Sequence, residues 1–128
     1  MKTIKKQYAV KKLDGTALSL EDFLYELPNI NKNIWAVLWV HATPINDNIN
    51  ILEIEDEINN SKTVKFLTAD ELVVFTKQFF QILEIFIIGD ANIKNLQRHE
   101  NDVLYYSSCE YVIELFDSSY WFINNQYF

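Results

Sequence analysis

The sequence predicts an α+β domain with one mainly antiparallel sheet of about five to seven strands and two helices packed on one face. Three observations support this prediction. The 128 residues fit a single domain over residues 1–128, and 49% of them are hydrophobic. Aromatic residues make up 15% of the chain, which provides a large apolar core at this length. The elements that local patterns predict follow the order β-α-β-β-β-α-β-β-β.

The first third of the chain predicts two strands and one helix. Residues 4–12 alternate weakly between apolar and Lys or Gln side chains, which is typical of a half-exposed edge strand. Residues 19–27 have apolar side chains at helical spacing and predict a helix that ends before Pro28. Residues 34–40, IWAVLWV, are continuously apolar and predict a strand that is buried on both faces.

The middle of the chain opens with LEIEDEI, residues 52–58, which has four carboxylates in five positions. Its alternation predicts a strand with Glu53, Glu55 and Glu57 in solvent and the aliphatic residues inside. Residues 62–67 are expected to pair back as a further strand. The sequence Thr68-Ala69-Asp70-Glu71 then matches a capping box and predicts the start of a second helix.

The last third of the chain predicts a central strand followed by a hairpin. Residues 82–88 are apolar on both sides except for Glu84, and Gly89 ends this strand. Residues 90–102 are polar and are expected to be irregular. Residues 111–115 and 120–123 predict two antiparallel strands that are joined by a tight turn.

The formal net charge of −7 is unevenly distributed along the chain. Residues 33–61 contain five acidic residues and residues 99–128 contain five more, and neither segment has a Lys or Arg. A nucleic-acid binder needs concentrated basic surface, so we expect no nucleic-acid partner. A negative surface instead attracts a basic protein.

Nothing in the sequence predicts secretion, a membrane span or a cofactor. Every apolar run is shorter than the ~20 residues that cross a bilayer, and the lysine-rich start lacks the apolar segment of a signal peptide. Cys109 is the only cysteine, so neither an intramolecular disulfide nor a zinc motif is expected. We therefore expect a cytoplasmic protein with no metal, no cofactor and no membrane partner.

The two histidines are the main candidates for catalysis. His41 follows an apolar strand, and His99 stands beside Arg98, Glu100 and Asp102. Such a set could supply a general acid and base or part of a metal site, although neighbouring side chains usually point in different directions. An ordinary structural role is favoured for each histidine. A small enzyme that uses His41 with the His99, Glu100 and Asp102 cluster is kept as an alternative.

The acidic segment is the strongest candidate for a binding surface. It has no basic neighbour in the sequence, so local ion pairs do not neutralise it, and a cationic partner would relieve its repulsion. Aromatic anchors inside an acidic rim are typical of protein-binding surfaces. The residues expected to bind a partner are the four carboxylates and two aromatic anchors, namely Glu53, Glu55, Asp56, Glu57, Tyr120 and Trp121.

The whole chain resembles the immunity proteins of bacterial polymorphic-toxin and contact-dependent growth-inhibition systems. The resemblance lies in its size, its acidity, its many aromatic residues and its lack of a catalytic signature. Its most suggestive local piece is the closing hairpin, in which residues 111–117 lead into Ser118-Ser119-Tyr120-Trp121. The resemblance implies stoichiometric inhibition of a cognate toxin domain, often a nuclease with a cationic groove that carboxylates would block. A non-catalytic adaptor or secretion chaperone that binds through an apolar groove is the other alternative.

Overall fold

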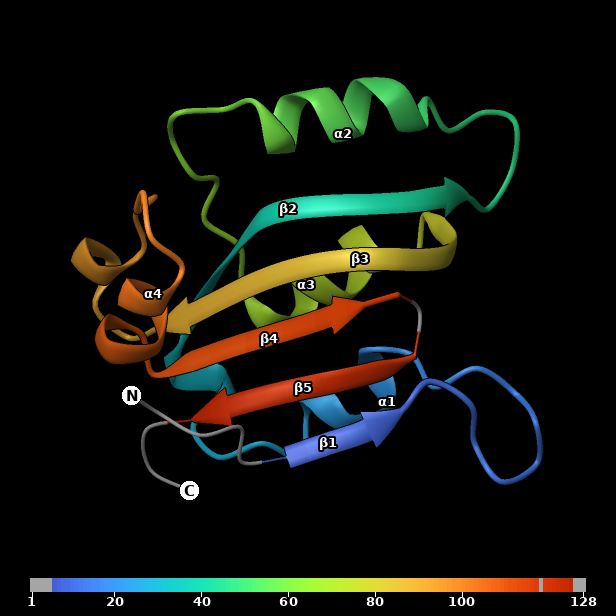
Figure 1. Ribbon diagram of the computed structural model, residues 1–128, viewed down its shortest axis with the longest axis horizontal. Helices are drawn as coiled ribbons and strands as arrows, with labels where there is room; N and C mark the ends of the chain where they lie inside the picture. The colour runs from blue at the N-terminus through green and yellow to red at the C-terminus, as the bar shows by residue number, and fades with distance from the viewer. Residues whose placement is uncertain (1–5, 118, 126–128) are drawn as a thin grey trace.

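The computed structural model describes residues 6–117 and 119–125, and its centre is a five-stranded antiparallel sheet (Figure 1). The strand order is β1-β5-β4-β3-β2, so β1 and β2 form the two edges. The strands are β1 (Lys6–Ala9), β2 (Ile34–Pro44), β3 (Phe79–Asp90), β4 (Tyr111–Phe116) and β5 (Tyr120–Asn125). The helices are α1 (Glu21–Leu24), α2 (Ile51–Asn59), α3 (Ala69–Thr76) and α4 (Val103–Ser108), with 3-10 turns η1 (Ile30–Lys32) and η2 (Ile93–Asn95). This arrangement confirms the predicted antiparallel α+β fold.

One face of the sheet, which we call the covered face, packs against α1 and α3. These are the two helices that the sequence predicts, and both lie behind the sheet in Figure 1. Alternate strand residues point to this face because side chains alternate along a strand. The main core cluster forms here, and its strand residues include Trp35, Val37, Ile85, Ile87, Ile113, Leu115, Trp121 and Ile123.

The opposite face, which we call the open face, is covered at one end only. There η2 and α4 contribute Leu96, Tyr105 and Cys109, which pack on Ala36, Leu38, Phe86, Ile88 and Val112. Figure 1 shows α4 at one end of the sheet, while no helix lies over the rest of this face. The remainder of the open face therefore presents strand side chains directly to solvent.

The capping box of α3 forms as the sequence predicts. The Thr68 hydroxyl accepts from the backbone N–H of Glu71 at 3.1 Å, and the Glu71 carboxylate accepts from the backbone N–H of Thr68 at 2.9 Å. Strands also form in the segments 34–40, 82–88, 111–115 and 120–123. In the described part of the first segment, β1 is shorter than expected and spans Lys6–Ala9.

The prediction of a strand over residues 52–58 is wrong, because this segment forms α2. Asn50 caps the helix by accepting from the backbone N–H of Glu53 at 3.1 Å. Ile51, Ile54 and Ile58 then fall at helical spacing and pack against the core of the covered face. The strand expected over residues 62–67 is also wrong, because this segment forms only a single bridge between Leu67 and Trp35. No element was predicted over Val103–Ser108, which forms α4.

Candidate functional site

Helix α2 lies along the outer edge of β2 (Figure 1). Three of its four carboxylates face solvent. Glu53, Asp56 and Glu57 are exposed. Glu55 points inward, where its carboxylate accepts from the backbone N–H of Ala42 at 3.0 Å and contacts His41 Nδ1 at 2.9 Å. The expectation that Glu55 points into solvent with Glu53 and Glu57 is therefore wrong, while its role in partner binding stays a prediction. Helical geometry places it on a different side of α2 from its acidic neighbours.

The inward side of α2 completes the exposed edge of β2. The Asn59 carboxamide donates to the carbonyl of Val40 and accepts from its N–H, both at 2.9 Å, in the way that a neighbouring strand would. Arg98 donates to the carbonyls of Leu38 at 2.9 Å and of Ile58 at 2.5 Å, which ties this edge to the end of α2. Unpaired strand edges recruit other strands, so these contacts protect β2 from aggregation.

Two of the three exposed carboxylates of α2 accept from side-chain amides, and none of the three takes part in an ion pair among the described residues. Asn50 donates to Glu53 at 3.3 Å, and Asn60 donates to Asp56 at 2.6 Å. The three ion pairs in the described part of the chain are Lys12–Asp22, His41–Glu55 and Lys77–Glu21. Among the described lysines, Lys6, Lys11 and Lys12 lie at or beyond β1, the opposite edge of the sheet. The negative charge of α2 is therefore not neutralised by the described N-terminal lysines.

Of the two expected aromatic anchors, only Tyr120 is on the surface. It lies on the open face with 43% of its area exposed, and its ring is 6.3 Å from that of Phe122. Trp121 is 2% exposed on the covered face, where its indole N–H donates to the carbonyl of Leu18 at 3.1 Å. The expectation for Trp121 is wrong because consecutive residues of a strand point to opposite faces.

Two exposed aromatic residues on the open face were missed by the sequence analysis. Trp39 is 45% exposed and Phe116 is 47% exposed. The indole N–H of Trp39 donates to the Glu84 carboxylate at 3.1 Å, which fixes the ring above β3. Trp39 looked buried because it belongs to a continuously apolar run. Together, Trp39, Glu84, Phe116, Tyr120 and Phe122 form what we call the open-face cluster.

The charge of the open face is negative. Strands β2 to β5 contain no Lys or Arg, whereas Glu84, Asp90 and Glu114 are acidic. Glu114 is buried beneath Tyr106, whose hydroxyl donates to it. Burial raises the pKa of the Glu114 carboxyl, and the hydrogen bond from Tyr106 opposes this increase. The strands of the open face therefore combine exposed aromatic rings with carboxylates and carry no Lys or Arg, and the pKa of the buried Glu114 carboxyl is raised.

The histidines that suggested catalysis lie in different surroundings. His99 and Asp102 line a hollow of about 320 Å³ beside the open-face cluster. The backbone N–H of His99 donates to the Tyr105 hydroxyl at 2.6 Å, and its ring lies 4.9 Å from that of Tyr105. His41 is not among the lining residues and instead contacts Glu55, while Glu100 is exposed outside the hollow. The structure thus brings His99 and Asp102 together but leaves His41 and Glu100 apart from them.

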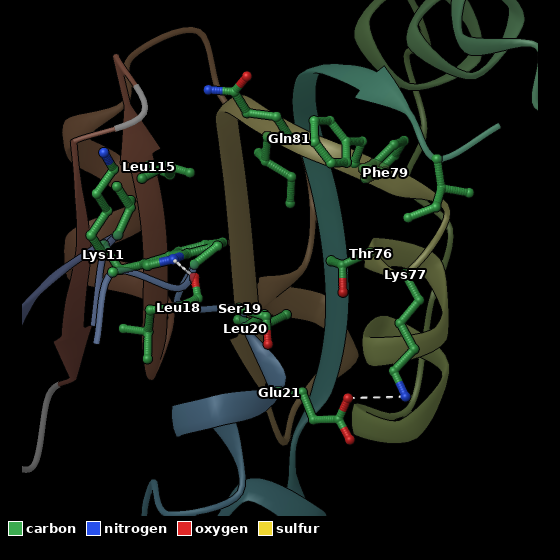
Figure 2. Close-up of a pocket in the computed structure, with 17 residues that line it drawn as sticks. Lys11, Leu18, Ser19, Leu20, Glu21, Thr76, Lys77, Phe79, Gln81 and Leu115 are labelled. Carbon is green, nitrogen blue, oxygen red and sulfur yellow. Dashed lines mark hydrogen bonds and ion pairs between the residues drawn. The ribbon is translucent and has the colours of Figure 1, made fainter. Parts of the chain in front are cut away.

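A larger hollow of about 570 Å³ opens on the other side of the sheet, between residues 10–21 and the junction of α3 with β3. Figure 2 shows Lys77 and Glu21 reaching across it, and their ion pair measures 2.9 Å. Most of its lining is apolar, as with Leu18, Phe79 and Leu115. Of the predicted partner-binding residues, only Trp121 lines it. This hollow therefore has a different chemistry from the open face.

Comparison of the chain with family models, with curated proteins and with solved structures gives no match. No helix in the described part of the chain is both long and apolar enough to cross a bilayer. Within residues 6–117 and 119–125, no three His, Cys, Asp or Glu side chains gather into a group that could hold a metal ion.

The exposed rings and carboxylates described above define the candidate functional site. It consists of the open-face cluster together with the exposed carboxylates of α2.

Proposed function

We propose that this chain is a cytoplasmic immunity protein that binds and neutralises a cognate toxin domain with a basic surface. One observation carries the proposal. The open face holds Trp39, Phe116 and Tyr120, each more than two-fifths exposed, on strands without any Lys or Arg. Large exposed apolar patches with a polar rim mark interaction sites, and aromatic rings are the side chains that most often dominate binding energy.

The exposed carboxylates of α2 support this proposal through their charge. Glu53, Asp56 and Glu57 add negative charge at the edge of the sheet where β2 and the open face end. Such a field steers a basic partner toward the surface and raises the association rate. The rings would then supply the apolar contact that slows dissociation. If the partner is a nuclease, these carboxylates take the place of phosphates in its cationic groove.

The experiment is co-expression with the C-terminal domain encoded by the reading frame immediately upstream, followed by light scattering of the purified complex. We expect a one-to-one complex that abolishes the toxicity of that domain. The double variant Glu53→Gln, Glu57→Gln should slow association about 10-fold at low salt. The matched control is Glu26→Gln, Asp70→Asn, which removes the same charge near α1 and α3 and should associate at the rate of the unmodified protein.

Two results would contradict the proposal. One is the absence of any complex with the upstream domain or with other basic domains encoded nearby. The other is an equal loss of association rate in both double variants, because net charge rather than the α2 surface would then be responsible. An adaptor that binds through the apolar hollow of Figure 2 would instead show little salt dependence, since screening weakens only the electrostatic contribution.

A further inference from the structure

The smaller hollow lies where the open-face cluster meets the segment that carries His99 and Asp102. Trp39, Glu84 and Phe116 line it from the strands, and Tyr105 of α4 lines it from the opposite side. Its volume of about 320 Å³ is at the lower end of the ~300–1,000 Å³ range of small-molecule sites. The hollow therefore suits one side chain or one small group rather than a folded segment of a partner.

The lining of this hollow combines aromatic rings with carboxylates. Trp39 and Phe116 leave nearly half of their surface exposed, and an aromatic face attracts a cation placed over it. Glu84 and Asp102 add two carboxylates, and neither takes part in an ion pair among the described residues. Both kinds of group favour a positively charged ligand.

Arg98 also lines the hollow, and each of its three guanidinium nitrogens already donates one hydrogen bond. Its guanidinium donates to the carbonyls of Leu38, Ile58 and Thr63, which holds it against the edge of β2 and the end of α2. The lining contains two carboxylates, Glu84 and Asp102, and one guanidinium, so it has one excess negative charge. The hollow can therefore accept a second cation, and Arg98 supports its wall.

We propose that this hollow receives the guanidinium group of an arginine side chain. A guanidinium is planar, so it can stack on the Trp39 indole while it donates two parallel hydrogen bonds to the Glu84 carboxylate. An ammonium is a more strongly hydrated point charge and lacks this fit. The source of the arginine, a surface residue of a basic toxin domain, rests on the proposed function. The proposal that the hollow binds an arginine side chain does not depend on the proposed function.

The test is an NMR titration of the full chain with N-acetyl-arginine-N-methylamide. We expect the indole N–H resonance of Trp39 to shift and to saturate, with affinity in the millimolar range. The neutral isostere N-acetyl-citrulline-N-methylamide should bind at least about 10-fold more weakly, because it keeps the shape and loses the charge. The lysine analogue should also bind more weakly than the arginine one.

Glu84→Gln is the decisive variant because its side-chain carbonyl can still accept from the Trp39 indole. We expect this variant to bind the arginine ligand with about 10-fold lower affinity. Glu26→Gln, which removes an exposed carboxylate near α1, should leave the affinity for that ligand unchanged. Equal binding of arginine and citrulline ligands, equal binding of arginine and lysine ligands, or an unchanged affinity in Glu84→Gln would each overturn the proposal.

Failure of this inference can be told apart from failure of the proposed function. If a basic toxin domain binds through the α2 carboxylates but is insensitive to Glu84→Gln, the arginine site is wrong and the immunity function stands. If the free arginine ligand binds as expected but no basic domain forms a complex, the site stands and the immunity function fails.

Discussion

The two faces of the sheet are built from the same strands but treat their aromatic residues in opposite ways. On the covered face, Trp35 and Trp121 are almost fully excluded from solvent by α1 and α3. On the open face, Trp39, Phe116 and Tyr120 stay in water because α4 covers only one end of the sheet. Each of these rings keeps nearly half of its area in water and so forgoes part of the roughly 1.5–3 kcal/mol that full burial of a large apolar side chain contributes to folding.

This difference separates residues that specify the fold from residues that are available for binding. The covered face contains the continuous core, so its side chains determine the stability of the domain. The open-face cluster contributes little to that core, and its exposure is the feature on which the proposed binding function rests. The predictions below test this division, from the largest expected change in stability to the smallest.

Trp35→Ala should give the largest loss of stability. Trp35 is fully buried, its ring lies 5.3 Å from that of Tyr111, and it fills the space above Gly89, where an added Cβ would lie 2.5 Å from the indole. Removing it leaves a large cavity, and we expect the free energy of unfolding in urea to fall by about 3–5 kcal/mol. Trp39→Ala is the matched control on the open face and should cost less than about 1 kcal/mol. Equal losses would remove the distinction between the faces.

Asn59→Ala should have an intermediate effect at the edge of the sheet. This change removes both hydrogen bonds to Val40 and leaves a backbone N–H and carbonyl of β2 without their protein partners. We expect a loss of about 1–3 kcal/mol in the free energy of unfolding, with concentration-dependent self-association through β2. Urea denaturation and size-exclusion chromatography measure the two effects.

The control for the edge is Asn60→Ala, the next residue along the chain. Its carboxamide donates only to the exposed Asp56 carboxylate, so we expect its stability to remain within about 0.5 kcal/mol of the unmodified protein. If both alanine variants behave alike, α2 does not protect β2 through the Asn59 side chain.

The part of the fold that local chemistry determines was predictable from the sequence. The strands with long apolar or alternating runs were found, and so was α3, because Thr68 and Glu71 satisfy the backbone groups of its first turn. α2 was missed because a short segment can fit two periods at once. Its aliphatic residues alternate as in a strand, yet Ile51, Ile54 and Ile58 also share one side of a helix that Asn50 caps.

The candidate site was only partly predictable, for a reason that concerns tertiary structure. The exposed carboxylates of α2 and Tyr120 follow from charge and composition. Trp39 could not be found, because a continuously apolar strand gives no sign of which face remains uncovered. That depends on how far α4 extends over the sheet, and α4 itself was not predicted. The inward turn of Glu55 likewise depends on the helical geometry of α2 and on its place beside Ala42.

The buried Glu114 carboxyl should make the free energy of unfolding depend on pH, with a smaller effect than the substitutions above. Burial raises the pKa of its carboxyl in the folded protein, so the folded state binds a proton more tightly than the unfolded chain does. The stability that this proton provides is fully present below the ordinary glutamate pKa, and it is lost as pH rises through the raised value. Glu114→Gln keeps an acceptor for the Tyr106 hydroxyl but removes the group that titrates. In this variant the urea midpoint should decrease less as pH rises above the ordinary glutamate pKa. An unchanged pH profile would contradict this assignment.

Tyr120→Ser should give the smallest change in stability and a large change in binding. Tyr120 is exposed on the open face, so we expect the free energy of unfolding to change by no more than about 0.5 kcal/mol. Under the proposed function Tyr120 is an anchor of the interface, so loss of its ring should cost about 2 kcal/mol or more of binding energy through faster dissociation from the toxin domain. A loss of stability comparable to that of Trp35→Ala would mean that the open face belongs to the core after all. An unchanged dissociation rate would mean that the partner binds elsewhere.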